Sequence, residues 1–414
     1  MKIALLTIGD ELLNGDLADT NTAEIARQLF ADGFRLHLSV STGDQLADIA
    51  TMLQNLVAEH DAVIVTGGLG PTEDDRTARA AARAFDRPLA LHDTALDQIR
   101  ARFRQWQRAM HPANEKQAML PSRSTVIANP EGTAPGFHLR QNNTELSFLP
   151  GGPREMGIML AAEVIPALRN RFPDRPPLCQ RTITLFGLPE PEVESRLQNC
   201  LPEQVALALN VDFPMVQVKL RTSGTDAQKN VDRAEVVVRK VLGDFIVGFD
   251  KTTLAETVGR QLTAAGRTLA LAESCTGGLI SKLLTDLPGA STYLERGIVS
   301  YANTAKIDCL GVDPEILERY GAVSDVCALA MARGVRMRAR TDIGLAVTGI
   351  AGPEGGTADK PVGTVYIALS GPDGEHAERF QFPGDRDRVR LRTACMALEW
   401  LRRATTPDLS GDAS

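Results

Sequence analysis

The sequence lacks several features that would assign it to common functional classes. Its six cysteines lie far apart and form no CxxC pair, so neither a structural zinc site nor a disulfide-rich scaffold is indicated. Lys and Arg total 45 against 52 Asp and Glu, and the net charge of −7 argues against a protein that coats nucleic acid. No apolar run approaches the roughly 20 residues that a membrane-spanning helix needs. We therefore expect a soluble, cytoplasmic protein that binds small molecules, with neither nucleic acid nor a membrane as partner.

The chain is long enough for several folded units. At about 150 residues per domain, 414 residues predict two or three domains. Hydrophobic residues make up 43% and charged residues 23%, values typical of globular proteins. A stretch rich in Pro and Arg between Pro166 and Pro177 indicates one boundary, and a new unit begins near Asp250. The predicted α/β domains cover residues 1–170, 171–250 and 251–414.

The first and third domains share a local pattern, a short apolar strand that runs into a glycine-rich turn and then a helix. In the first domain the strand at 61–66 leads into GGLGPT, and in the third the strand at 269–272 leads into ESCTGG. Apolar runs that alternate with helical patterns are typical of βαβ units and a largely parallel sheet. The middle domain is predicted to be a small α+β module without the basic excess of a nucleic-acid binder.

The turn in the third domain contains a candidate nucleophile. Ser274 follows the strand directly, where its hydroxyl would be exposed at the sheet edge and the next backbone N–H groups could converge on an anionic oxygen. A histidine base is nearly excluded, because His376 is the only histidine in residues 251–414. We expect Lys306, partly buried against Tyr301, to lose its proton near neutral pH and to accept the serine proton.

Simpler interpretations compete with this one. ESCTGG alone is also typical of a helix cap and a tight turn, and a single lysine such as Lys306 usually lies on the surface. Cys275 is an alternative nucleophile, but no nearby histidine would lower its pKa, so we expect it to be a small packed residue.

Taken together, these segments resemble the C-terminal domain of the CinA family of competence/damage-inducible proteins. The resemblance is carried by AESCTGGLIS, GIVSYANTAKIDCLGV, YGAVSDVCALAMARGV, VTGIAGPEGGTADKPVGTVY and the later Gly384-Asp385-Arg386. It implies a nicotinamide mononucleotide deamidase, which hydrolyses the carboxamide to nicotinic acid mononucleotide and ammonia. It also implies Ser274 as nucleophile and Tyr301 and Lys306 as the activating pair, and the hydrolysis needs no cofactor.

We expect the substrate contacts of this domain to be groups that stabilise negative charge, on the oxyanion that hydrolysis creates and on the substrate phosphate. Backbone N–H groups of the turn would stabilise the tetrahedral oxyanion. The resemblance implies a threonine close to the substrate, and the glycine loop behind it and a later helix start are candidates for the phosphate. The predicted set is Cys275, Thr276, Gly277, Gly278, Thr348, Gly349 and Arg386.

The first domain resembles the N-terminal domain of the same family, whose fold is that of molybdopterin-binding proteins. IGDELLNGDLADTNTAEIARQL, VTGGLGPTEDDRT, NPEGTAPGF and LPGGPREM carry the likeness. It implies hydrolysis of ADP-ribose with a divalent cation, for which magnesium is expected. Backbone amides at Gly67, Gly68 and Gly70 would approach the pyrophosphate. The predicted metal ligands are Asp10, Glu11, Asp74 and Asp75.

Some alternatives stay open at this point. Asp74 and Asp75 could instead only favour the positive end of the next helix. Asp10 stands where many relatives have threonine, so the acidic pair Asp10-Glu11 either adds a ligand or spoils the site.

The sequence thus predicts a homodimeric enzyme of pyridine nucleotide salvage. Its middle domain resembles the family's KH-like domain, but it has no GxxG loop, so RNA binding is not expected. The alternative functions are a molybdopterin-related enzyme and a non-catalytic partner in competence or DNA recombination.

Overall fold

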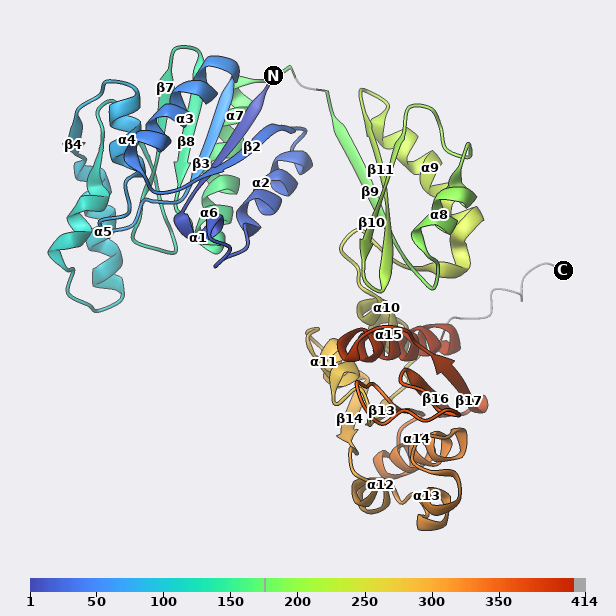
Figure 1. The fold of residues 1–414 in the computed structure, drawn as a ribbon. Helices are drawn as coiled ribbons and strands as arrows, with labels where there is room; N and C mark the ends of the chain where they lie inside the picture. Colours follow the sequence, from blue (N-terminus) through green and yellow to red (C-terminus); the bar gives the residue numbers. More distant parts are fainter. Residues whose placement is uncertain (175, 406–414) are drawn as a thin grey trace. The chain divides into compact units, whose positions relative to one another are not determined.

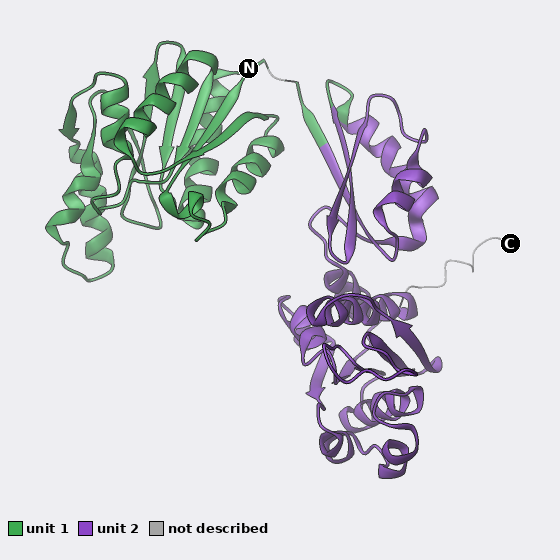
Figure 2. Cartoon of the chain, in the orientation of Figure 1, with its two compact units in different colours: residues 1–179, 223–227 green, residues 180–222, 228–414 purple. Residues whose placement is uncertain are grey.

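The computed structural model describes residues 1–174 and 176–405, and the chain forms two compact units that we describe separately (Figure 2). Unit 1 comprises residues 1–179 and 223–227, and unit 2 comprises residues 180–222 and the chain from 228 onward. Among the described helices, none combines the length and apolar character required to cross a membrane.

Unit 1 is built around a six-stranded sheet in the order β2-β1-β3-β8-β7-β6 (Figure 1). The first four strands are parallel, as the sequence predicts, and β7 is antiparallel to both of its neighbours. All residues of β1 are buried, and they alternate between two cores: Leu6 packs with helix α3 on one face and Leu5 with helix α2 on the other. The strands are β1 (Ile3–Ile8), β2 (Leu36–Thr42), β3 (Ala62–Thr66), β6 (Thr125–Ile127), β7 (Gly136–Gln141) and β8 (Thr144–Leu149).

Helices cover both faces of this sheet, and a small ribbon of β4 (Leu89–Leu91) and β5 (Met119–Pro121) lies apart from it. The helices are α1 (Asp10–Leu13), α2 (Thr20–Ala31), α3 (Leu46–Glu59), α4 (Thr77–Ala84), α5 (Asp93–Gln105), η1 (Pro112–Ala118), α6 (Pro153–Met159), η2 (Leu160–Val164) and α7 (Ile165–Arg171).

Helix α4 differs from the sequence pattern, which favours a helix that starts at Thr72 with Asp75 as its capping partner. The helix begins five residues later, at Thr77. The Asp75 carboxylate instead accepts a 2.9 Å hydrogen bond from the Thr72 backbone N–H within the loop. Asp74 and Asp75 therefore lie outside the first turn of α4. The hydrogen bond between Thr72 and Asp75 closes a loop and does not cap the helix.

Unit 2 begins with a module whose four-stranded sheet has the order β10-β11-β9-β12. Helices α8 and α9 supply Val193, Leu197, Val238 and Leu242 to its core. Strand β10 opens with the short apolar run Ala206–Leu209, and its residues are half-buried or exposed. The elements are β9 (Leu178–Phe186), α8 (Glu190–Leu197), β10 (Ala206–Asp212), β11 (Met215–Ser223), α9 (Ala227–Leu242), η3 (Gly243–Phe245) and β12 (Ile246–Phe249).

The rest of unit 2 surrounds a five-stranded sheet in the order β14-β13-β15-β16-β17. Strands β14, β13 and β15 are parallel, and β16 and β17 complete the sheet as an antiparallel hairpin. Leu271 of β13 packs in a core with α10, α11 and α15, while Ala270 and Ala272 face α14. Small alanines on that side let α14 approach the sheet closely.

The elements of this part, in chain order, are α10 (Leu254–Ala264), β13 (Leu269–Glu273), α11 (Leu279–Thr285), η4 (Ala290–Thr292), β14 (Leu294–Val299), α12 (Asn303–Leu310), α13 (Pro314–Tyr320), α14 (Asp325–Ala339), β15 (Ile343–Gly349), β16 (Thr364–Gly371), β17 (Gly374–Gln381) and α15 (Arg386–Thr405).

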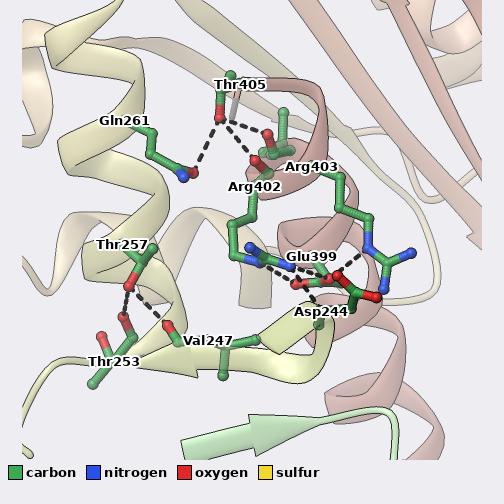
Figure 3. Close-up of polar contacts among 10 residues, drawn as sticks. Asp244, Val247, Thr253, Thr257, Gln261, Glu399, Arg402, Arg403 and Thr405 are labelled. Atoms are coloured by element: carbon green, nitrogen blue, oxygen red, sulfur yellow. Dashed lines mark hydrogen bonds and ion pairs between the residues drawn. The ribbon is translucent and has the colours of Figure 1, made fainter. Parts of the chain in front are cut away.

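The two parts of unit 2 share a hydrophobic core. Val247 of β12 is buried in the same cluster as residues of α10 and α15. Two hydrogen bonds cross the junction (Figure 3): Thr257 Oγ1 donates to the Val247 carbonyl at 2.8 Å, and Arg402 Nη2 donates to the Asp244 carbonyl at 3.3 Å. The middle module is thereby packed against the ends of two helices of the C-terminal sheet domain.

Candidate active site

Ser274 lies at the end of β13, as the sequence predicts. Its backbone N–H donates to the Val347 carbonyl of β15 at 3.0 Å, so the turn leaves the sheet between two parallel strands. The carboxyl ends of β14, β13 and β15 share one edge of the sheet. Open α/β sheets bind ligands at such an edge.

Lys306 reaches Ser274 from helix α12, which follows β14. Its side chain is only 1% exposed, and Nζ lies 3.2 Å from Ser274 Oγ. Nζ also lies 2.8 Å from the Ser300 carbonyl oxygen and 3.2 Å from that of Tyr301. The lysine is therefore a buried partner of the serine and not a surface residue.

The surroundings of Lys306 change the ease with which its ammonium group loses a proton. Burial lowers the pKa of its ammonium group below the usual value for lysine. A neutral amine has two N–H donors and one lone pair, and the carbonyls of Ser300 and Tyr301 can only accept. In the neutral form, these carbonyls can take both N–H groups, and the lone pair is then available for the proton of the Ser274 hydroxyl. This geometry suits a general base.

Glu273 organises the turn, although the sequence patterns assigned it no role. Its buried carboxylate accepts hydrogen bonds from Thr276 Oγ1 at 2.8 Å and from the Ile280 N–H at 3.1 Å. It also accepts from both the N–H and Oγ of Ser281, at 2.8 and 2.6 Å. The only sequence signal for this role of Glu273 is that an acidic residue directly precedes a turn and a helix that contain Thr276 and Ser281. The helix-start N–H groups of Ile280 and Ser281 are thus occupied by the protein's own anion.

Fewer turn amides than predicted are left for an oxyanion. The Gly277 N–H donates to the Ser274 carbonyl at 3.1 Å and so closes the turn. The N–H groups of Cys275, Thr276 and Gly278 have no backbone carbonyl partner within the described residues. Gly277 and Gly278 have φ values of 60° and 92°, the left-handed region that favours glycine.

Cys275 is a packed residue, in line with the sequence expectation. It lies in the hydrophobic core beneath the turn, and burial raises its thiol pKa to about 12. At neutral pH the thiol stays protonated and is a poor nucleophile.

The hydroxyl of Tyr301 contacts neither Ser274 nor Lys306 in the hydrogen bonds of the described residues. Tyr301 is 60% exposed, and its hydroxyl accepts a 2.9 Å hydrogen bond from Arg386 Nη2. Arg386 Nη1 donates to the Gly352 carbonyl at 2.6 Å. Tyr301 therefore reaches the base through its backbone carbonyl, and its ring and Arg386 form a second polar group beside the glycine loop.

Thr348 and Gly349 end β15 next to the catalytic turn. Thr348 is buried, and its hydroxyl donates to the Ala322 carbonyl at 2.8 Å. A side chain at Gly349 would meet the Thr364 carbonyl oxygen at 2.7 Å. Both residues shape the strand end, and the Thr348 hydroxyl is already engaged by the protein.

The glycine turn of unit 1 takes part in the chain's own packing. Gly67 and Gly68 have φ values of 108° and 64°, and the Gly67 N–H donates to the Leu149 carbonyl at 3.1 Å. A cavity of about 280 Å³ next to this turn is lined by Gly68, Leu69, Gly70, Glu73, Asp75, Ala78, Arg79, Leu89, Lys116, Gln117, Met119 and Leu120. Gly67 is not part of that lining.

The predicted metal ligands do not form a metal site. Asp10 Oδ1 accepts the Asp44 N–H at 3.1 Å, and Asp44 Oδ2 accepts the Asp10 N–H at 2.9 Å, so these bonds join the start of α1 to the loop after β2. Burial, followed by the charges of Asp10, Glu11 and Asp74, raises the pKa of the Asp44 carboxyl. No group of three or more His, Cys, Asp or Glu residues suited to a metal ion occurs in the described residues. As arranged, the carboxylates do not fit a divalent cation, and we derive no step through one.

Comparison with known families and proteins accounts for most of the chain. Residues 251–405 match the model of the CinA C-terminal domain, and residues 4–170 match that of a probable molybdopterin binding domain. A CinA-like protein of Syntrophotalea carbinolica is 53% identical over 404 residues, which cover 97% of this chain and 98% of the relative. One of Geobacter metallireducens is 48% identical over 408 residues, 97% of this chain and 99% of the relative.

A solved structure is similar to part of the chain. The competence/damage inducible protein CihA from Agrobacterium tumefaciens is 44% identical, with a TM-score of 0.36, and the match covers 36% of this chain and 92% of that protein. The two matching family descriptions name no ADP-ribose pyrophosphatase.

Proposed function

This chain belongs to the family of CinA-like proteins, and from that premise we propose that its C-terminal domain hydrolyses the carboxamide of nicotinamide mononucleotide to give nicotinic acid mononucleotide and ammonia. The observation that carries the proposal is the buried amine of Lys306 within 3.2 Å of Ser274 Oγ. Amide hydrolysis by a serine requires such a base.

The first half of the reaction forms an acyl-enzyme. Lys306, as a neutral amine, accepts the Ser274 proton while Oγ attacks the carboxamide carbon. The negative charge that develops on the oxygen is stabilised by turn N–H groups, of which those of Cys275 and Thr276 are candidates. The resulting Lys306 ammonium donates its extra proton to the departing nitrogen, which leaves as ammonia.

The second half repeats the proton transfers with water. Lys306 is neutral again after ammonia departs, and it accepts a proton from the water that attacks the acyl carbon. Collapse of the second tetrahedral intermediate returns the proton to Ser274 Oγ and releases the acid. The burial that lowers the Lys306 pKa supports both transfers, because the amine must exchange protons near neutral pH.

The substrate phosphate is assigned to Arg386. Its guanidinium lies between the Tyr301 hydroxyl and the Gly352 carbonyl, at the same strand edge as the turn. Arg binds phosphate strongly through paired N–H donors. Nucleotide salvage follows as the role of the protein, since the acid product is a precursor for biosynthesis.

A direct assay tests the proposal. Wild-type protein incubated with nicotinamide mononucleotide is expected to release ammonia and nicotinic acid mononucleotide in equal amounts. Ser274→Ala is expected to abolish the release while circular dichroism stays unchanged. Full turnover by this variant would remove the serine mechanism.

For unit 1 a separate and narrower proposal stands: the cavity beside Gly68 and Gly70 binds ADP-ribose. Arg79 and Lys116 line that cavity and supply positive charge for a pyrophosphate. Calorimetric titration with ADP-ribose, with and without magnesium, tests it.

Two further measurements test the alternative functions. Release of a bound pterin from the purified protein would favour the molybdopterin-related alternative, and salt-sensitive binding of single-stranded DNA would favour the recombination alternative.

A further inference from the structure

The start of helix α15 carries two pairs of arginines on opposite faces. Arg386 and Arg390 are four residues apart and share one face, and Arg388 and Arg392 share another. The two pairs are offset by two residues, which is about 200° around a helix. One segment of helix therefore presents guanidinium groups in two directions.

The first pair reaches the proposed active site. Arg386 binds the Tyr301 hydroxyl and the Gly352 carbonyl, as described above. Arg390 Nη2 donates to the Thr276 carbonyl at 2.9 Å, within the turn that follows the nucleophile. No sequence pattern pointed to Arg390.

The second pair holds an aromatic ring of the middle module. Phe213 lies in the turn between β10 and β11, and the guanidinium carbons of Arg388 and Arg392 each lie 4.9 Å from its ring centroid. Met215, two residues later, packs against the core of the C-terminal domain. Arginine over an aromatic face is attracted to the electrons of the ring.

Because the two contacts lie within the first two turns of the same helix, they are mechanically connected. We propose that Phe213 is a positioning residue for the deamidase site, which holds the start of α15 so that Arg386 and Arg390 stay against the catalytic turn. The inference rests on the proposed function. Because Phe213 belongs to the middle module, that module then helps to position the residues of the C-terminal active site.

The first turn of α15 is capped by Asp385, whose carboxylate accepts the Arg388 N–H at 2.9 Å, and the Phe213 ring adds a contact from outside the helix. The initial N–H groups of a helix lack intrahelical partners, so a helix start frays easily. Gly384, just before it, has a φ of 126°, which only glycine adopts readily. The other end of α15 is tied to the middle module through Arg402 and Asp244 (Figure 3). Phe213 supplies the corresponding contact at the end that carries Arg386.

Kinetics of the full-length protein test the proposal. Phe213→Ala is expected to raise the KM for nicotinamide mononucleotide about fivefold or more. We expect kcat to fall by less than KM rises, because Arg390 binds the catalytic turn at the Thr276 carbonyl, whereas the contact of Lys306 with Ser274 does not involve α15. Phe213→Tyr keeps the ring and should restore the wild-type KM. Val236→Ala is the matched control, because Val236 is 66% exposed on α9 of the same module.

Hydrogen exchange supplies a readout that needs no activity. Peptides that cover residues 386–392 should exchange faster in Phe213→Ala than in wild type and Phe213→Tyr, and peptides of α9 should not change. If wild-type protein releases no ammonia, the proposed function fails, and exchange alone decides whether Phe213 holds α15.

A second variant covers the case in which Phe213→Ala does not fold. Arg388→Gln combined with Arg392→Gln removes the same contact from the helix side and leaves the residues at the catalytic turn in place. It should give the same rise in KM and the same faster exchange. Unchanged KM and unchanged exchange in a folded variant of either kind would overturn the proposal.

Discussion

The Ser281 hydroxyl and backbone N–H both donate to the carboxylate of Glu273, at 2.6 and 2.8 Å. Together with the bonds from Thr276 and Ile280, they tie the end of β13 to the first turn of α11. Ser274 lies between the end of β13 and the first turn of α11, so the orientation of its side chain is fixed before substrate binds. Such preorganisation is a major source of rate acceleration in enzymes.

Glu273→Gln is expected to weaken this arrangement. An amide presents N–H groups to partners that are themselves donors, so at least one buried donor loses its acceptor at a cost of about 1–3 kcal/mol. We expect a lower free energy of unfolding in urea and a kcat reduced at least about tenfold. Ser281→Ala removes a single hydroxyl donor and serves as the milder comparison. A Glu273→Gln variant with wild-type stability and rate would mean that the carboxylate does not organise the turn.

Lys306→Ala should lower kcat for ammonia release by about 10²-fold or more, because no other base contacts Ser274 Oγ among the described residues. Lys282→Ala provides the control, since Lys282 is an exposed lysine on α11 that pairs with Asp286. A small effect at Lys306 would assign proton transfer to another group.

The pH profile should show the altered titration of Lys306. The competent form is the neutral amine, and burial lowers the pKa of the group. Activity is therefore expected to rise as pH increases through that lowered pKa and to be lost as pH falls below it. Rates of ammonia release across a pH series measure this. Activity that increases towards acid pH would contradict a lysine base.

Stability should follow the same group with a definite sign. Between the lowered pKa of folded Lys306 and 10.5, the usual lysine pKa, the amine is protonated in the unfolded chain. In the folded protein it loses that proton more easily. The wild-type free energy of unfolding should therefore rise with pH between the lowered pKa and 10.5, relative to Lys306→Met. Urea denaturation of both proteins at several pH values tests this, and parallel curves would show that Lys306 titrates normally.

Asp75→Ala is expected to affect unit 1 alone. The carboxylate accepts the Thr72 N–H and lines the cavity beside the glycine turn, so its removal should loosen that loop and weaken ADP-ribose binding at least about tenfold. Deamidation should stay at the wild-type rate, because all its proposed residues lie in unit 2. Calorimetry and the ammonia assay on the same preparation provide the comparison. Loss of deamidation together with loss of ADP-ribose binding would contradict the separation of the two sites.

Local patterns predicted the catalytic elements well. The strands before the two glycine turns, predicted at 61–66 and 269–272, appear as Ala62–Thr66 and Leu269–Glu273. Strand β17 carries a weak local signal, because Ala377 and Phe380 are its only apolar side chains. The start of α4 was misplaced because Thr72 and Asp75 form the same hydrogen bond in a loop as in a helix cap.

The acidic residues of unit 1 show a second limit of prediction from the sequence, which concerns the hydrogen-bond partners of carboxylates. Asp44 was absent from the predicted set, although it exchanges two hydrogen bonds with Asp10 across 34 residues of chain. Sequence spacing identified carboxylates that suit a hard cation, but it could not show that some of them would bind backbone N–H groups instead.

By itself, the sequence determined that a serine would stand at a strand-to-helix turn, because glycines and apolar runs act on neighbours a few residues away. It also indicated which lysine could serve as base. Only the tertiary structure decided that Lys306 is buried against Ser274, that Tyr301 turns its hydroxyl to Arg386, and that Phe213 lies between two arginines of α15. These contacts join residues distant in the chain, so strand order and shared cores bring them together, and no local pattern encodes that approach.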